Sequence, residues 1–188
     1  MKTQLQEELA LITAQKNSAA PFLLTALLCI WGSVVSPWPA LPLILFAILL
    51  SLLCVIDAKT QTLPDLLTYS GIILGLVLSP TPLLEKLGGT LIGALVFITL
   101  AAVFFRVKKQ HGMGYGDIKL LALIGAWLGA AALLPTLLVA SLTALIALPL
   151  RQKLTHTPTT HAIAFGPFLI LGAWLSLLYG QIFWQLLL

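Results

Sequence analysis

The sequence predicts an all-α membrane protein, a polytopic transmembrane helix bundle of about seven crossings (six to eight) with a cytoplasmic N-terminus. Three observations support this fold class. Of 188 residues, 60% are hydrophobic and 9% are charged, whereas a soluble domain carries about 25% charged residues. The apolar residues form uncharged runs close to or above the roughly 20 residues that cross a bilayer. The basic residues cluster between these runs, as in cytoplasmic loops.

The N-terminal residues 1–20 form a separate segment in this prediction. Leu5, Leu9 and Ile12 recur at helical spacing opposite polar residues, a pattern typical of an amphipathic helix lying on the membrane. We assign residues 21–188 to a single transmembrane domain.

Four crossings are expected in the first half of the chain. Residues 17–56 form an uncharged run of 40 residues, and the Ser-Pro-Trp-Pro sequence at 36–39 divides it into two helices. Residues 66–84 and 87–105 form the third and fourth crossings. Glu85 and Lys86 make the short turn between them.

The apolar run from 120 to 150 is too long for one crossing and short for two. Lys119 precedes this run, and Arg151 and Lys153 follow it. Basic residues mark the cytoplasmic side, so both ends belong on that side and the number of crossings is even. We therefore expect two short or tilted helices that turn within residues 129–135.

A last crossing is expected from about Ile163, with Trp174, Tyr179 and Trp184 as interfacial anchors. This topology leaves Lys86 as the one basic residue outside. The other nine are cytoplasmic: Lys2, Lys16, Lys59, Arg106, Lys108, Lys109, Lys119, Arg151 and Lys153.

The chain contains three aspartates, Asp57, Asp65 and Asp117, and this topology places all of them at the cytoplasmic face. Charged groups close to lipid are costly and therefore indicate function. Asp57 and Asp117 are separated by two complete crossings, so a bundle can bring them together. Two adjacent carboxylates share a proton, and such a pair can act as base on water and acid towards a carbonyl, as in aspartic proteases.

Helix ends suggest how the pair divides these roles. Asp57 lies at a helix C-terminus, where the dipole opposes ionisation, and Asp117 lies at a helix N-terminus, where the dipole favours the anion. The hypothesis is that Asp57 is the acid and Asp117 the base. Solvent or a nearby cation such as Lys119 would reverse it, and coupled groups titrate as a pair.

The glycines before Asp117 have a separate expected role. Gly114 and Gly116 permit backbone geometry and close approach of a peptide that other residues exclude. Taken alone, Gly-x-Gly-Asp also fits a turn followed by a capping aspartate. Asp65 follows Pro64 and is expected to cap or position the third helix rather than take part in chemistry.

No cofactor or metal is expected. Cys29 and Cys54 are isolated in apolar runs, and the histidines 111, 156 and 161 lack ligand spacing. The net charge of +4 is explained by basic cytoplasmic loops that contact lipid headgroups, so no nucleic-acid partner is predicted.

The chain resembles the bacterial type IV prepilin leader peptidases, membrane aspartic proteases of the Gly-x-Gly-Asp type. Residues 56–57 and 63–68, Ile-Asp and Leu-Pro-Asp-Leu-Leu-Thr, are similar to the first aspartate block of that family. Residues 112–121, Gly-Met-Gly-Tyr-Gly-Asp-Ile-Lys-Leu-Leu, resemble the second block, and residues 125–129 continue it. Phe-Gly-Pro-Phe at 165–168 is similar to the C-terminal signature.

This resemblance implies that Asp57 and Asp117 are the catalytic pair and that Asp65 is a non-catalytic neighbour. The implied reaction removes a short basic leader from type IV prepilins or type II secretion pseudopilins, at the cytoplasmic face of the bacterial inner membrane. The remaining candidate binding or positioning residues are Pro64, Gly114, Gly116, Lys119, Gly166 and Pro167.

The chain departs from full-length family members in one respect. Those members carry an N-terminal region with two Cys-x-x-C pairs, and many also methylate the new N-terminus with S-adenosylmethionine. These 188 residues contain no Cys-x-x-C, so the expectation is a short form without zinc. Methyltransferase activity is not part of this prediction.

Two alternatives remain from the sequence. A small transporter or channel could use paired carboxylates for proton or cation coupling, although this does not explain the three sequence blocks together. A scaffold could bind pilins without cutting them. The oligomeric state is left open.

Overall fold

The computed structural model describes residues 19–36, 38–108, 114–155 and 164–188. The predicted surface helix therefore lies outside the described residues, except for its last two positions. The histidines at 111, 156 and 161 also lie outside them.

The described residues form seven α-helices and one short 3₁₀ turn, and contain no strand, which confirms the predicted all-α bundle. Stretches within α3, α5, α7 and α8 are long and apolar enough to cross a membrane. The helices are α2 (Ala19–Val35), α3 (Ala40–Thr60), α4 (Asp65–Leu78), α5 (Leu83–Lys108), α6 (Tyr115–Leu128), α7 (Leu133–Thr155) and α8 (Gly166–Leu187), with the 3₁₀ turn at Ala130–Ala132.

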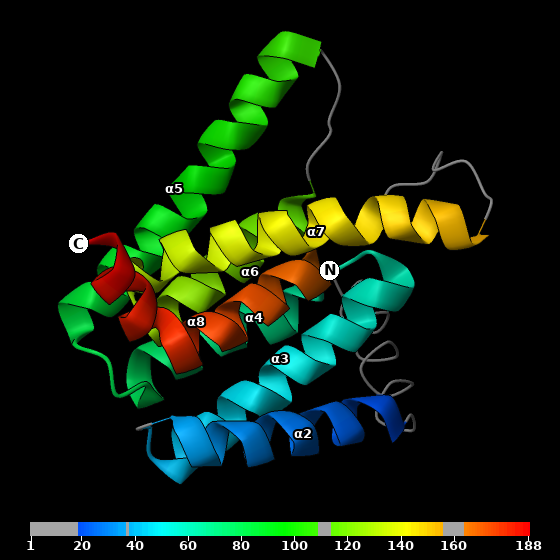
Figure 1. Ribbon diagram of the computed structural model, residues 1–188. Coiled ribbons are helices and arrows are strands. Elements are labelled where there is room, and N and C mark those ends of the chain that lie inside the picture. The colour runs from blue at the N-terminus through cyan, green and yellow to red at the C-terminus, as the bar shows by residue number, and fades with distance from the viewer. Residues whose placement is uncertain (1–18, 37, 109–113, 156–163) are drawn as a thin grey trace.

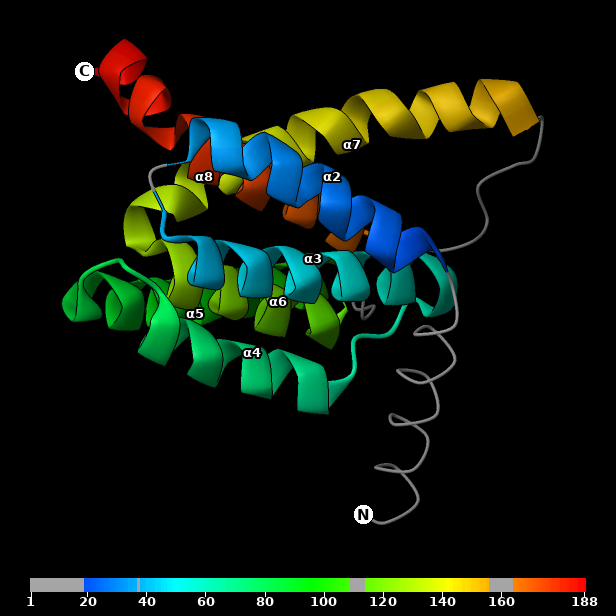
Figure 2. The same ribbon diagram turned by 90° about the horizontal axis from the view of Figure 1, so that it is seen from below.

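Successive helices run in opposite directions along the bundle (Figures 1 and 2). The last turn of α3 and the first turns of α4, α6 and α8 consequently lie at one end of the molecule. We call this the aspartate end, because Asp57, Asp65 and Asp117 all belong to these turns. Its counterpart, where α2 is followed by α3 and α6 by α7, is called the opposite end.

The two short helices predicted for residues 120–150 are present as α6 and α7. Gly129, with a φ of 81°, ends α6 and starts the 3₁₀ turn. Glycine adopts this positive-φ conformation at little cost, so the predicted turn forms at the glycine that the sequence provides.

The boundary between the third and fourth crossings differs from the prediction. The third helix, α4, ends at Leu78 rather than at 84, and α5 begins at Leu83. Pro80 and Pro82 explain this, because a proline disfavours helical geometry at the residue before it. Lys86 is therefore part of α5.

Lys86 is also buried, with 6% of its surface exposed. Its Nζ donates to the carbonyls of Leu76, at 2.9 Å, and Ser79, at 3.0 Å. These carbonyls belong to the C-terminal end of α4, where backbone acceptors lack helical partners and favour a cation. The basic residue expected outside thus caps a helix at the opposite end.

Aromatic side chains fill the core of the bundle towards the opposite end. Phe46 of α3 stacks on Trp127 of α6, with ring centroids 5.0 Å apart, and lies 6.3 Å from Trp174 of α8. Trp174 is 1% exposed, so its predicted role as an interfacial anchor is wrong. The sequence pattern does not distinguish an interfacial tryptophan from a core one, but packing against Phe46 places Trp174 in the core.

Helices α5 and α6 approach each other through glycines. A Cβ at Gly89 would lie 2.5 Å from the carbonyl oxygen of Gly125, and one at Gly93 would lie 2.7 Å from that of Leu121. Small residues of this kind let backbones pack closely within membranes. Phe97 of α5 still belongs to the core, and beyond it the helix leaves the bundle (Figure 1), where Val103 is exposed.

Two adjacent glycines in α5 provide a matched test of this packing. We expect Gly89→Ala to destabilise the detergent-solubilised protein by about 1–3 kcal/mol, because the new methyl group meets backbone. Gly88→Ala should be neutral or stabilising by up to about 1 kcal/mol, since nothing lies within 4 Å of its Cβ position. Thermal unfolding measures both, and equal effects would contradict the packing described.

Candidate active site

Asp57 lies in the last turn of α3, close to the helix C-terminus at which the sequence analysis placed it. The helix continues to Thr60, and Gln61 then takes a left-handed conformation and donates its N–H to the Asp57 carbonyl at 2.9 Å. Asp57 is 5% exposed. The helix thus holds this carboxylate inside the bundle at the aspartate end.

Asp117 lies in the first turn of α6. Gly114 precedes this helix in an extended conformation, and its carbonyl accepts the N–H of Asp117 at 3.1 Å. The side chain is half-buried. The structure therefore places both predicted carboxylates at the aspartate end, near enough for the negative charge of Asp57 to act on Asp117.

The N-terminus of α8 is the third element beside this pair. Gly166 is the first residue of α8 and Pro167 the second, and the backbone amide of Gly166 attracts the Asp57 carboxylate. The N–H groups of Phe168 and Leu169 are bonded to the carbonyl of Phe165. Since proline has no N–H, Gly166 supplies the amide of this turn that faces Asp57.

A side chain at position 166 would not fit beside Asp57. A Cβ there would overlap with Oδ2 of Asp57 and lie 2.9 Å from its Cγ. Proline early in a helix and glycine before it are both compatible with a helix start. The Phe-Gly-Pro sequence therefore begins α8 and lets its first turn approach the carboxylate.

Two helix ends act on Asp57 in opposite senses. The C-terminus of α3 opposes a negative charge there, whereas the N-terminus of α8 favours it. The sequence argument considered only α3. Helix dipoles therefore do not by themselves identify the acid of the pair.

The Oδ2 atom of Asp57 is buried and accepts no hydrogen bond from the residues that the structure describes. A buried carboxylate oxygen without a donor is costly. A proton, a water molecule or a bound substrate would supply the missing donor. A buried carboxylate oxygen that lacks a donor is expected in a reactive group, whereas a structural carboxylate does not need one.

The two glycines of Gly-x-Gly-Asp lie in different surroundings. Gly114 is exposed, and a Cβ there would lie 3.7 Å from Oδ2 of Asp117. Gly116 faces Leu63, and a Cβ there would lie 2.9 Å from Cδ1 of that leucine. Gly114 therefore leaves the approach to Asp117 open, and Gly116 makes room for the loop between α3 and α4.

Asp65 and Lys119 form an ion pair beside the carboxylate pair. Asp65 is the first residue of α4 and not its N-cap, the place that the predicted capping role required, because the N-cap is the buried Pro64. Lys119 also lies over the ring of Tyr69, 5.3 Å from its centroid. Since its ammonium group pairs with Asp65, the cation joins the first turns of α4 and α6.

No group of three or more His, Cys, Asp or Glu side chains in the described ranges could hold a metal ion. The arrangement instead offers two interacting carboxylates, one buried and one half-buried, at the end of an apolar bundle. Such a pair can hold one proton between its members and perform general acid–base chemistry on a water molecule.

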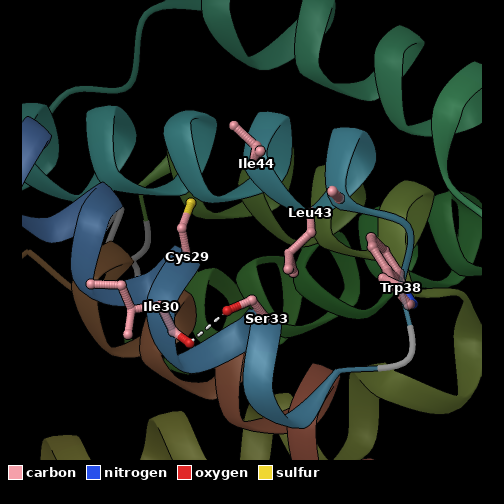
Figure 3. A pocket seen from close by; sticks show the side chains of 7 residues that line it. Cys29, Ile30, Ser33, Trp38, Leu43 and Ile44 are labelled. Atoms are coloured by element: carbon pink, nitrogen blue, oxygen red, sulfur yellow. Dashed lines mark hydrogen bonds between the residues drawn. The ribbon is translucent and has the colours of Figure 1, made fainter.

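A cavity of about 360 Å³ lies elsewhere, between α2 and α3 (Figure 3). Cys29 and Ser33 of α2 line it together with Trp38 and Leu43, and Ser33 donates to the carbonyl of Ile30. Its α3 residues lie at the start of that helix, and Asp57 lies near its end, about 20 Å away at 1.5 Å per residue. This cavity is therefore separate from the carboxylate pair.

The sequence analysis missed one residue beside the pair, Leu63. It is a buried apolar residue in an otherwise polar loop. A leucine between Thr62 and Pro64 is a weak signal, because a short loop gives no periodicity from which burial follows.

Comparison with known proteins gives consistent matches. Residues 44–148 match the type IV leader peptidase family. The chain is 37% identical over 148 residues to a prepilin leader peptidase/N-methyltransferase of Pseudomonas aeruginosa, and 38% identical over 166 residues to one of Aeromonas salmonicida. These alignments cover 77% and 85% of this chain but 51% and 57% of the relatives. The chain thus spans about half the length of the curated relatives it matches. No solved structure matches it.

The Asp65–Lys119 pair should contribute little to stability. Both side chains are partly exposed, at 51% and 25%, and exposed ion pairs are typically worth about 0.2–1 kcal/mol. A double-mutant cycle with Asp65→Asn and Lys119→Met, followed by thermal unfolding, should give a coupling in this range that falls with added salt. A coupling above about 2 kcal/mol would show a desolvated pair instead.

Proposed function

Because the chain belongs to the type IV leader peptidase family, we propose that it is a membrane-embedded aspartic endopeptidase. Its substrates in this proposal are type IV prepilins or type II secretion pseudopilins, from which it removes the short basic leader peptide. The relatives' names support the substrate class. The observation that carries the proposal is that the last turn of α3 and the first turn of α6 hold Asp57 and Asp117 at the same end of the bundle, near enough for the charge of one to act on the other.

In the proposed reaction the two aspartates share one proton. The ionised carboxylate takes a proton from water, and the resulting hydroxide attacks the scissile carbonyl while the protonated partner donates its proton to the carbonyl oxygen. The tetrahedral diol then loses a proton from one hydroxyl as the leaving nitrogen gains one, and the C–N bond breaks. The pair again holds a single proton at the end.

The neighbouring residues have positioning roles in this proposal. The exposed Gly114 gives a peptide backbone access to Asp117, and the Gly166 amide with Pro167 holds Asp57 at the start of α8. The Asp65–Lys119 ion pair joins the elements that follow each catalytic aspartate. Gly116 and Pro64 allow the intervening loop to pack against α6.

The proposed location is the bacterial inner membrane, with the aspartate end facing the cytoplasm. The described basic residues Lys59 and Lys119 at this end support the orientation through the positive-inside rule. A basic leader on the cytoplasmic side would then meet the two carboxylates directly. The apolar segment that follows it would remain in the bilayer.

Removing either catalytic carboxylate should abolish cleavage. With detergent-solubilised protein and a prepilin substrate, we expect Asp57→Asn and Asp117→Asn each to lower cleavage by at least about 10³-fold. Asp65→Asn should cause a smaller loss, because that residue only positions others. Gel analysis of the shortened product measures all three, and full activity in either of the first two variants would exclude the proposed pair.

Position 166 gives an independent test through backbone packing. We expect Gly166→Ala to lower cleavage by about 10²-fold or more, because its methyl group displaces Asp57 and small misplacements of catalytic groups are costly. Gly180→Ala in the same helix is the matched control, since its Cβ would meet Ser176 Oγ at an ordinary 3.6 Å. If Gly166→Ala cleaves the substrate as fast as Gly180→Ala does, the position of Asp57 does not depend on this contact.

A further inference from the structure

The loop between α3 and α4, residues 61–64, follows the helix that carries Asp57 and packs against the first turn of α6. It begins at Gln61, whose N–H is bonded to the Asp57 carbonyl. Thr60 Oγ1 donates to the carbonyls of Ile56 and Thr62, at 2.9 Å and 3.2 Å. Hydrogen bonds thus tie the start of this loop to the turn of helix that holds Asp57.

The end of the loop is also tied down. The Pro64 carbonyl accepts both the N–H and the hydroxyl of Thr68, each at 3.1 Å. Between the two tethered ends, Leu63 is 9% exposed and belongs to the hydrophobic core. The loop therefore has little freedom to move its one buried aliphatic side chain.

Leu63 lies directly against Gly116. A Cβ at position 116 would lie 2.9 Å from Leu63 Cδ1, 3.3 Å from its Cβ and 3.4 Å from its Cγ. Because the Leu63 Cβ is itself among these atoms, rotation of the side chain alone would not relieve the contact. The segment after Asp57 and the residue before Asp117 are thus packed so closely that a side chain at position 116 would displace Leu63.

This contact relates the positions of the two carboxylates. A shift of Leu63 is transmitted through the loop to the last turn of α3, and a shift of Gly116 moves its neighbour Asp117. The Asp65–Lys119 ion pair joins the same two segments but is partly exposed, and an exposed pair holds geometry weakly. The buried contact is therefore the more rigid of the two links.

We propose that Leu63 is a positioning residue that sets the separation of Asp57 and Asp117 through its contact with Gly116. The inference rests on the proposed peptidase function. The combined volume of the side chains at positions 63 and 116 sets the distance between the two carboxylates, and this distance determines how they share their proton. A change in that volume therefore affects the rate of cleavage rather than the binding of substrate.

The contact itself is tested without any activity. In a chain with Cys29→Ser and Cys54→Ser, the pair Leu63→Cys and Gly116→Cys should form a disulfide on mild oxidation. Its Cβ positions lie 3.3 Å apart, and a shift of a few tenths of an ångström brings them into the range of about 3.5–4.5 Å that such bonds need. The matched control is Leu63→Cys with Gly114→Cys, because no atom of Leu63 is among those within 4 Å of the Cβ position at 114. Equal disulfide yields from both pairs, measured by thiol labelling, would overturn the contact.

The positioning role is tested by compensating changes in volume. We expect Gly116→Ala to lower kcat about tenfold or more with little change in KM. Adding Leu63→Ala to that variant should recover at least severalfold of the loss and return the pH profile of kcat towards that of the wild type. Leu63→Met, which keeps the volume, should remain close to wild type.

Leu133→Ala is the control for lost packing alone, because this buried leucine starts α7 at the opposite end. It should lower stability and leave kcat and its pH profile unchanged. If the two substitutions at 63 and 116 are additive, or if Leu63→Ala behaves as Leu133→Ala does, the proposed role is wrong. Absence of cleavage by the wild type would instead refute the peptidase function, and the disulfide result would still stand.

Discussion

The electrostatic interaction between Asp57 and Asp117 is the one on which the proposed function of this bundle depends. Two carboxylates at the end of an apolar bundle repel each other and lose hydration, so their proximity needs support from the fold. The support comes from three helix ends: the last turn of α3, the first turn of α6 and the amide of Gly166 at the start of α8. Adding or removing one crossing between two of these turns would place the later one at the opposite end.

Close packing elsewhere keeps those helix ends in place. Glycines let α5 and α6 meet backbone to backbone, and the aromatic rings of Phe46, Trp127 and Trp174 join α3, α6 and α8 in the core. Near the opposite end of the bundle the Ser79 hydroxyl donates to the Trp127 carbonyl at 2.5 Å. Close-packed interiors of this kind resist displacement, so these contacts help to keep α6 in its place in the bundle.

Much of this arrangement follows from the sequence, because hydropathy and charge are strong signals in membrane proteins. They predicted the turns at residues 36–39 and 129–135 and placed both aspartates at one end. Periodicity could not show that Trp174 is a core residue, because apolar residues occupy every face of such a helix and no face is marked as buried. Nor could it show that Lys86 is buried, because its acceptors are carbonyls of another helix. The effect of α8 on Asp57 was similarly hidden, since it depends on a contact between residues more than 100 positions apart.

An infrared titration of the aspartates tests the central claim most directly, because the carboxyl stretch reports protonation of each group without requiring cleavage. If Asp57 and Asp117 act as a coupled pair, each one titrates differently when the other is replaced by asparagine. We predict that the band assigned to Asp57 shifts its midpoint in Asp117→Asn, and that the band of Asp117 shifts its midpoint in Asp57→Asn. Asp65→Asn should leave both nearly unchanged. Identical titration of each aspartate with and without its partner would contradict the account.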